Sequence, residues 1–122
     1  MHREPLLAKL RLYHPVEGHE TEMYERIIEF VQRNKNCFDR ELLEGHITAS
    51  ALIVNKKRSH TLMTHHHKLE KWLQLGGHSD GEPNPLNVAL REAEEESGIS
   101  GIVPVSENIW DKSPISVRSR IV

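Results

Sequence analysis

Three glutamates lie close together in the segment PLNVALREAEEESG, residues 85–98, which has the apolar spacing of an amphipathic helix. At about 100° per residue, Glu92, Glu95 and Glu96 fall on one face of that helix. An apolar stripe beside this face is formed by Leu86, Ala89, Leu90 and Ala93. Carboxylates three and four positions apart repel each other, and a divalent cation would turn that repulsion into attraction. The pattern therefore suits Mg²⁺, a hard ion that takes oxygen ligands, water and phosphate. A solvated charged face is the alternative, because exposed Glu is an ordinary helix former.

The residues around the glutamates carry a resemblance to a known family. The segment GGHSDGEPNPLNVALREAEEESGI, residues 76–99, resembles the signature of the Nudix hydrolases, G-x5-E-x7-R-E-U-x-E-E-x-G-U with U aliphatic. The matching positions are Gly77, Arg91, Glu92, Ala93, Glu95, Glu96, Gly98 and Ile99. The first glutamate of the signature falls on Pro83, so either Glu82, one residue early, takes its role or the role is lost. Residues 65–81, HHHKLEKWLQLGGHSDG, resemble a bacterial subgroup of the family.

The resemblance implies an α/β (α+β) fold, an α/β/α sandwich with a mixed sheet. It also implies hydrolysis of a nucleoside diphosphate linked to another group, in which Mg²⁺ or Mn²⁺ activates the water that attacks phosphorus. Carried over residue by residue, the catalytic residues are Glu95, Glu92 and Arg91, and the metal ligands are Glu92, Glu95, Glu96 and Glu82. Arg91 would orient a glutamate through an ion pair. Substrate and its phosphates would lie against Gly76, Gly77 and His78.

Helices and strands must position these residues. Apolar spacing predicts helices over residues 4–13 and 21–34, and over 86–97 with Asn84 as N-cap and Gly98 as the C-terminal glycine. Strands are expected over 46–54 and 60–65, joined as a hairpin by a turn at 55–58, and over 72–75, ended by Gly76 and Gly77. One or two short strands are expected within 99–105 and 109–110. The predicted domains are a helical extension over 1–44, a partial Nudix domain over 45–111 and a divergent tail over 112–122.

The tail, DKSPISVRSRIV from residue 111, resembles nothing in the family. Strands and a long helix expected after Ile99 are missing, so we expect a C-terminally truncated domain. A sheet edge left unpaired invites homo-oligomer formation and a poorly ordered tail, with Trp110 exposed. Truncation would put turnover in question, so one alternative is a non-catalytic nucleotide- or metal-binding remnant. Another is an unrelated helical or histidine–metal module.

Composition excludes several classes of protein. The chain has 122 residues, with 16 Lys plus Arg against 18 Asp plus Glu and a net charge of −2, which gives no basic face for a nucleic-acid duplex. No apolar run approaches the ~20 residues that cross a bilayer, and residues 1–16 do not form a signal peptide, so no membrane association and a cytoplasmic location are expected. Cys37, the single cysteine, is predicted to be a small core residue.

Nine histidines raise the question of a transition-metal site, and three of them are consecutive at 65–67. Consecutive residues of a strand alternate faces, so at most two of the three can converge on one ion, and no cysteine joins them. Structural or surface roles are therefore expected, with contact to a substrate pocket as the alternative. Trp72 and Trp110 could stack on a base, but core packing is the expected role.

Overall fold

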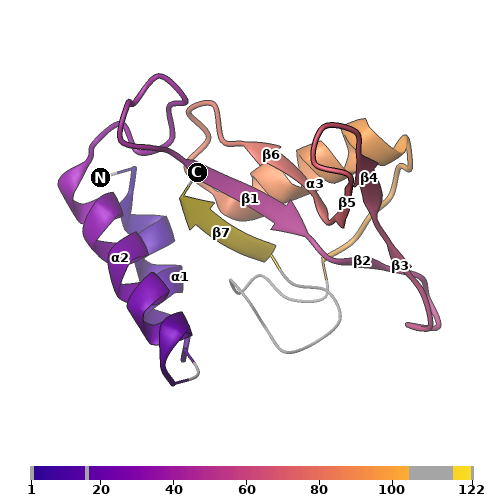
Figure 1. The fold of residues 1–122 in the computed structure, drawn as a ribbon, viewed down its shortest axis with the longest axis horizontal. Helices are drawn as coiled ribbons and strands as arrows, with labels where there is room; N and C mark the ends of the chain where they lie inside the picture. The colour runs from indigo at the N-terminus through magenta and orange to yellow at the C-terminus, as the bar shows by residue number, and fades with distance from the viewer. Residues whose placement is uncertain (1, 16, 105–116, 122) are drawn as a thin grey trace.

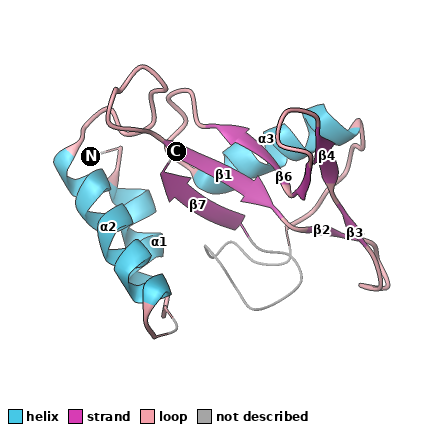
Figure 2. Ribbon diagram, viewed as in Figure 1, coloured by secondary structure: helices cyan, strands magenta, loops and turns pink. Residues whose placement is uncertain are grey.

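The computed structural model describes residues 2–15, 17–104 and 117–121, the last of these through their backbone (Figures 1 and 2). The helices are α1 (Glu4–Leu12), α2 (His19–Arg33) and α3 (Pro85–Ser97). The strands are β1 (Ile47–Ala51), β2 (Ile53–Val54), β3 (Thr61–Leu62), β4 (Thr64–His66), β5 (Lys71–Leu73), β6 (Leu75–His78) and β7 (Val117–Ile121). No helix in the described ranges is long and apolar enough to span a membrane.

Helices α1 and α2 pack on each other and on the start of β1, which confirms both N-terminal helix predictions. Their buried cluster consists of Leu6, Leu7, Leu10, Val31, Cys37, Phe38 and Ile47. The Tyr24 hydroxyl donates to the Leu10 carbonyl at 2.8 Å, and the Ile47 amide donates to the Cys37 carbonyl at 2.7 Å. Cys37 is fully buried, as predicted, and burial raises the pKa of its thiol to about 11.

Strand β1 lies at the centre of a three-stranded antiparallel sheet with the order β6-β1-β7. Side chains on β1 alternate: Ala49 and Ala51 pack against α3, and Thr48 and Ser50 line a cleft on the other face. Figure 1 shows α3 running behind this sheet. The prediction that Gly76 and Gly77 end a strand is wrong, because both lie within β6 and pair with β1.

Two short hairpins extend from the sheet. The predicted hairpin is confirmed as β2–β3, with Ile53 opposite Leu62, and Asn55 Oδ1 accepts hydrogen bonds from the amides of Ser59 and His60. The single strand predicted over 46–54 is broken at Leu52, so that β1 pairs with β6 and β7 while β2 pairs with β3. A second hairpin, β4–β5, places His65 opposite Trp72.

Helix α3 begins and ends as predicted. The Asn84 side chain accepts from the Leu86 amide at 3.1 Å, and Gly98 takes a left-handed conformation with φ 71°. Of the predicted apolar stripe, Ala89 and Ala93 are buried, but Leu86 and Leu90 are only half-buried. The sheet covers the flank that contains Val88, which is fully buried and lies outside the predicted stripe.

The α+β class is confirmed, although the described strands pair only in antiparallel fashion, so the mixed pairing implied by the resemblance is not found among them. The tail prediction is wrong for residues 117–121, which form β7 and pair with β1 along its whole length. Residues 99–104 form no strand. Trp110 and the strand expected over 109–110 lie outside the described residues.

Candidate active site

Small side chains bring α3 close enough to the sheet for Glu92 to touch the backbone of β6. A Cβ atom added to Gly77 would lie 2.7 Å from Cδ of Glu92, so only glycine leaves room for this carboxylate. The Glu92 side chain is 17% exposed. The Glu92 carboxylate is therefore half-buried against the glycine backbone of β6.

Arg91 fixes the helix to the end of β6. Its Nη2 donates to the His78 carbonyl at 2.6 Å and lies 3.3 Å from Oε1 of Glu92. The guanidinium therefore contacts both the strand that carries Gly77 and the carboxylate that rests on it. This is the position in which an arginine can orient a glutamate.

Glu96 lies one helical turn beyond Glu92 and lines the cleft above β1 and β6. The pKa of Glu96 is raised, first by burial and then by the negative charges of Glu92 and Glu95. The Gly76 backbone amide acts in the opposite direction and lowers the pKa of Glu96. Glu95 and Glu96 are both exposed, and of the two only Glu96 lines the cleft. Among the described residues, Glu96 is the glutamate of this face that lines the cleft, and Glu92 lies beside it under Gly77.

Glu82 serves the start of α3. Its Oε1 accepts from the Asn84 amide at 3.0 Å and from Nδ2 of Asn87 at 3.3 Å. Within the described residues, no group of three or more His, Cys, Asp or Glu side chains converges as metal ligands. The donor chemistry on α3 still fits a hard cation, because the carboxylates of Glu92 and Glu96 are oxygen ligands whose mutual repulsion a cation would relieve.

His78 belongs to a polar cluster at the end of β6. Its Nδ1 lies 2.7 Å from Nε2 of His46, and burial lowers the pKa of His46, as do the neighbouring His78 and Arg40 side chains. Arg40 in turn makes two 2.8 Å hydrogen bonds to the carboxylate of Asp80, which hold the pKa of Asp80 low. Sequence reasoning missed Arg40 and His46. The signal that could have pointed to them is Asp80, a charged residue between Gly77 and Gly81 that needs a partner of opposite charge.

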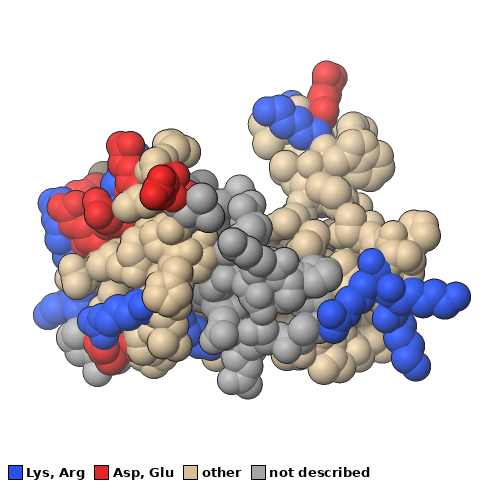
Figure 3. Space-filling model, turned by 90° about the horizontal axis from the view of Figure 1, so that it is seen from below, with Lys and Arg blue, Asp and Glu red and all other residues tan. Residues whose placement is uncertain are grey.

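The cleft has a volume of about 800 Å³. One wall is formed by α1 and α2, and the opposite wall is the β4–β5 hairpin, which projects away from the helices in Figure 3. The lining also includes Gly76, Gly77, His78 and Glu96.

The expected core role of Trp72 is wrong, since its side chain is 65% exposed and lines the cleft. Among the consecutive histidines, His65 packs edge-on against Trp72 and His66 lines the cleft.

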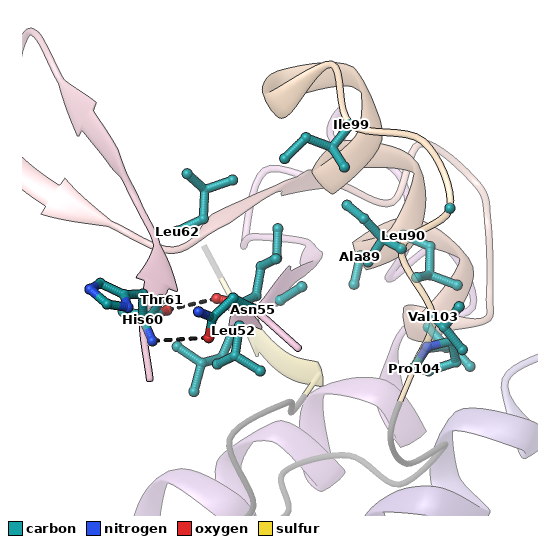
Figure 4. Close-up of a pocket in the computed structure, with 16 residues that line it drawn as sticks. Leu52, Asn55, His60, Thr61, Leu62, Ala89, Leu90, Ile99, Val103 and Pro104 are labelled. Carbon is teal, nitrogen blue, oxygen red and sulfur yellow. Dashed lines mark hydrogen bonds between the residues drawn. The ribbon is translucent and has the colours of Figure 1, made fainter. Parts of the chain in front are cut away.

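A second cavity of about 470 Å³ lies on the other flank of α3 and is apolar. Figure 4 shows Ala89 and Leu90 of α3 on one side of it, with Leu52 and Leu62 from the β2–β3 region on the other. Polar groups of the lining, Asn55 and Thr61, bond to the hairpin's own backbone. This cavity lacks the carboxylates of the cleft and explains why Leu90 is only half-buried.

Comparisons with known proteins identify the family of the chain. No curated protein matches the chain. The family profile described as NUDIX domain matches residues 45–115, which include β1 to β6, α3 and the whole glutamate segment. This match covers more than half of the 122 residues. The chain therefore belongs to the NUDIX domain family.

Proposed function

We propose that this chain hydrolyses the pyrophosphate linkage of a nucleoside diphosphate derivative, with Mg²⁺ or Mn²⁺ bound at the glutamates of α3. Membership of the family supports a Nudix hydrolase in general. The observation that carries the proposal is the contact of α3 with β6, where Glu92 rests on Gly77 and Glu96 lines a large cleft together with Gly76 and Gly77.

In this proposal, Glu92 and Glu96 hold the cation and Glu95, on the same helical face, is the third ligand. The cation, when bound, neutralises phosphate oxygens and lowers the pKa of a water molecule. Arg91 keeps Glu92 in place through its bonds to His78 and to the carboxylate itself. Gly76 and Gly77 leave the backbone open to a phosphate, and His78 lies beside them in the cleft. Glu82 stays at the helix start, where its bonds to Asn84 and Asn87 keep it.

The test is hydrolysis of a panel of nucleoside diphosphate derivatives by the purified chain, with Mg²⁺ and then with EDTA. We expect product only with metal, and we expect Mg²⁺ to raise the thermal midpoint because it binds the folded state. Glu96→Gln should abolish turnover and most of the midpoint shift. Glu94→Gln is the matched control, since Glu94 lies on the same helix and is also exposed but does not line the cleft.

The outcomes separate the candidate functions. A midpoint shift that depends on Glu96, without product from any derivative, would favour the non-catalytic metal- or nucleotide-binding protein. An unchanged midpoint at millimolar Mg²⁺ in a chain shown to be folded would favour the solvated charged face, and the proposal would be wrong.

A further inference from the structure

The cleft above Glu96 has two walls that α3 does not supply. Leu10, Tyr24 and Ile27 face it from the N-terminal helices, which lie outside the residues that match the family. The opposite wall comes from the β4–β5 hairpin and carries Trp72 and Leu69. The N-terminal helices therefore help to build the cleft.

The apolar side chains at the mouth are unusually exposed. Trp72 is 65% exposed, Leu69 56%, and Met23, on α2 across the cleft, 38%. The Trp72 ring does not stand alone, because His65 packs against it edge-on with ring centroids 5.0 Å apart. A tryptophan that packs edge-on against a histidine and is open to a cleft is suited to stacking on a planar ring.

The cleft also has polar lining. Thr48, Ser50 and Gln74 belong to it, and Ser50 Oγ donates to Gln74 Oε1 at 3.2 Å. An amide side chain offers both a donor and an acceptor, as the edge of a nucleobase requires. Glu96 and the glycine backbone of β6 line the same cleft. The cleft therefore combines a side chain for ring stacking, hydrogen-bonding groups and the proposed cation site.

The proposed cation site also orients an occupant. A cation bound at Glu96 would hold the diphosphate at that end of the cleft, because it would stand between the two negative groups. The volume of about 800 Å³ lies within the range of small-molecule sites.

From this arrangement we propose that Trp72 stacks on the nucleobase of the substrate, and that the N-terminal helices close the opposite side of this base site. The inference rests on the proposed function, and it makes Trp72 a specificity-determining residue. A diphosphate without a planar ring should bind at the Glu96 end alone and more weakly.

Tryptophan fluorescence tests the inference directly. The chain has two tryptophans, so Trp110→Phe leaves Trp72 as the single reporter. With Mg²⁺ present, adenosine diphosphate with a methylene bridge in place of the linking oxygen should quench the emission, because the linkage resists hydrolysis and the ring stacks on the indole. Methylene diphosphonate, which lacks the ring, should leave the emission unchanged. Equal quenching by both probes, or quenching by neither while the nucleotide binds by calorimetry, would overturn the proposal.

Kinetics separate this inference from the proposed function. Trp72→Ala should raise KM about tenfold and leave kcat nearly unchanged, which is the effect of losing one base stack. Trp72→Phe should restore most of the affinity. Leu62→Ala, which removes an exposed apolar side chain outside the cleft, is the control and should change neither constant.

An unchanged KM in Trp72→Ala with turnover intact would refute the base site without contradicting the proposed hydrolase activity. Quenching by the nucleotide probe without turnover of any derivative would support the base site and refute the hydrolase.

Discussion

The two buried clusters of the structure differ in the size of their side chains. The N-terminal cluster contains Leu6, Leu7, Leu10, Val31, Cys37, Phe38 and Ile47, whereas the cluster between α3 and the sheet contains Ala49, Ala51, Val88, Ala89 and Ala93. Large side chains remove more apolar area from water, so the first cluster contributes more to stability. Small side chains let backbones approach, so the second brings glutamates onto a glycine strand. The fold therefore separates the part that stabilises the chain from the part that positions the site.

The largest effect on stability should come from the first cluster. Phe38→Ala empties a fully enclosed site and should lower the free energy of unfolding by about 3–5 kcal/mol, measured by urea denaturation. Ala89→Gly, at a buried position of the second cluster, is the comparison and should cost about 1 kcal/mol, mostly through helix propensity. Equal losses in the two variants would contradict the division between the clusters.

The two glycines of β6 should separate stability from site geometry. A Cβ on Gly76 would lie 2.5 Å from the Ala49 carbonyl oxygen, so Gly76→Ala strains backbone pairing and should cost about 1–3 kcal/mol. A Cβ on Gly77 would meet only the end of the Glu92 side chain, which can rotate away. Gly77→Ala should therefore cost less stability than Gly76→Ala but abolish most of the turnover and of the Mg²⁺-dependent midpoint shift. A Gly77→Ala protein that keeps both would show that the Glu92 contact does not matter to the site.

Local sequence signals were sufficient to predict where the helices lie. The apolar spacing of α1 and α2, the Asn84 cap and Gly98 all act within a few residues of the chain, so they can be recognised before the fold is known. The glutamate face of α3 follows from the same periodicity.

Features that depend on distant partners could not be predicted in this way. Glycine usually interrupts a strand, but Gly76 and Gly77 continue β6 because β1 and α3 need the space of a missing Cβ. The pairing of Arg40 with Asp80 joins residues 40 positions apart, and no periodicity connects them. The exposure of Trp72 depends on how far the β4–β5 hairpin stands from α2, which is a property of the tertiary structure.

The smallest expected effect is a gain in stability when a glutamate of the site is neutralised. It sharpens the comparison of the two clusters, because it makes the site on α3 a source of instability. Burial and the neighbouring charges raise the pKa of Glu96, so the fold favours the protonated carboxyl. The stabilisation from the protonated Glu96 carboxyl is fully present below the ordinary pKa of glutamate, about 4.3. It is lost as the pH rises through the raised pKa of Glu96. In EDTA at about pH 7, above the ordinary pKa of glutamate, Glu96→Gln should therefore have a slightly higher thermal midpoint than the wild type, and the difference should shrink below about pH 4. Glu94→Gln removes the same charge outside the cleft and should show a smaller gain. If Glu96→Gln is instead less stable than the wild type at neutral pH, the hydrogen bond from the Gly76 amide outweighs burial and repulsion, and the metal-free glutamate face is not strained.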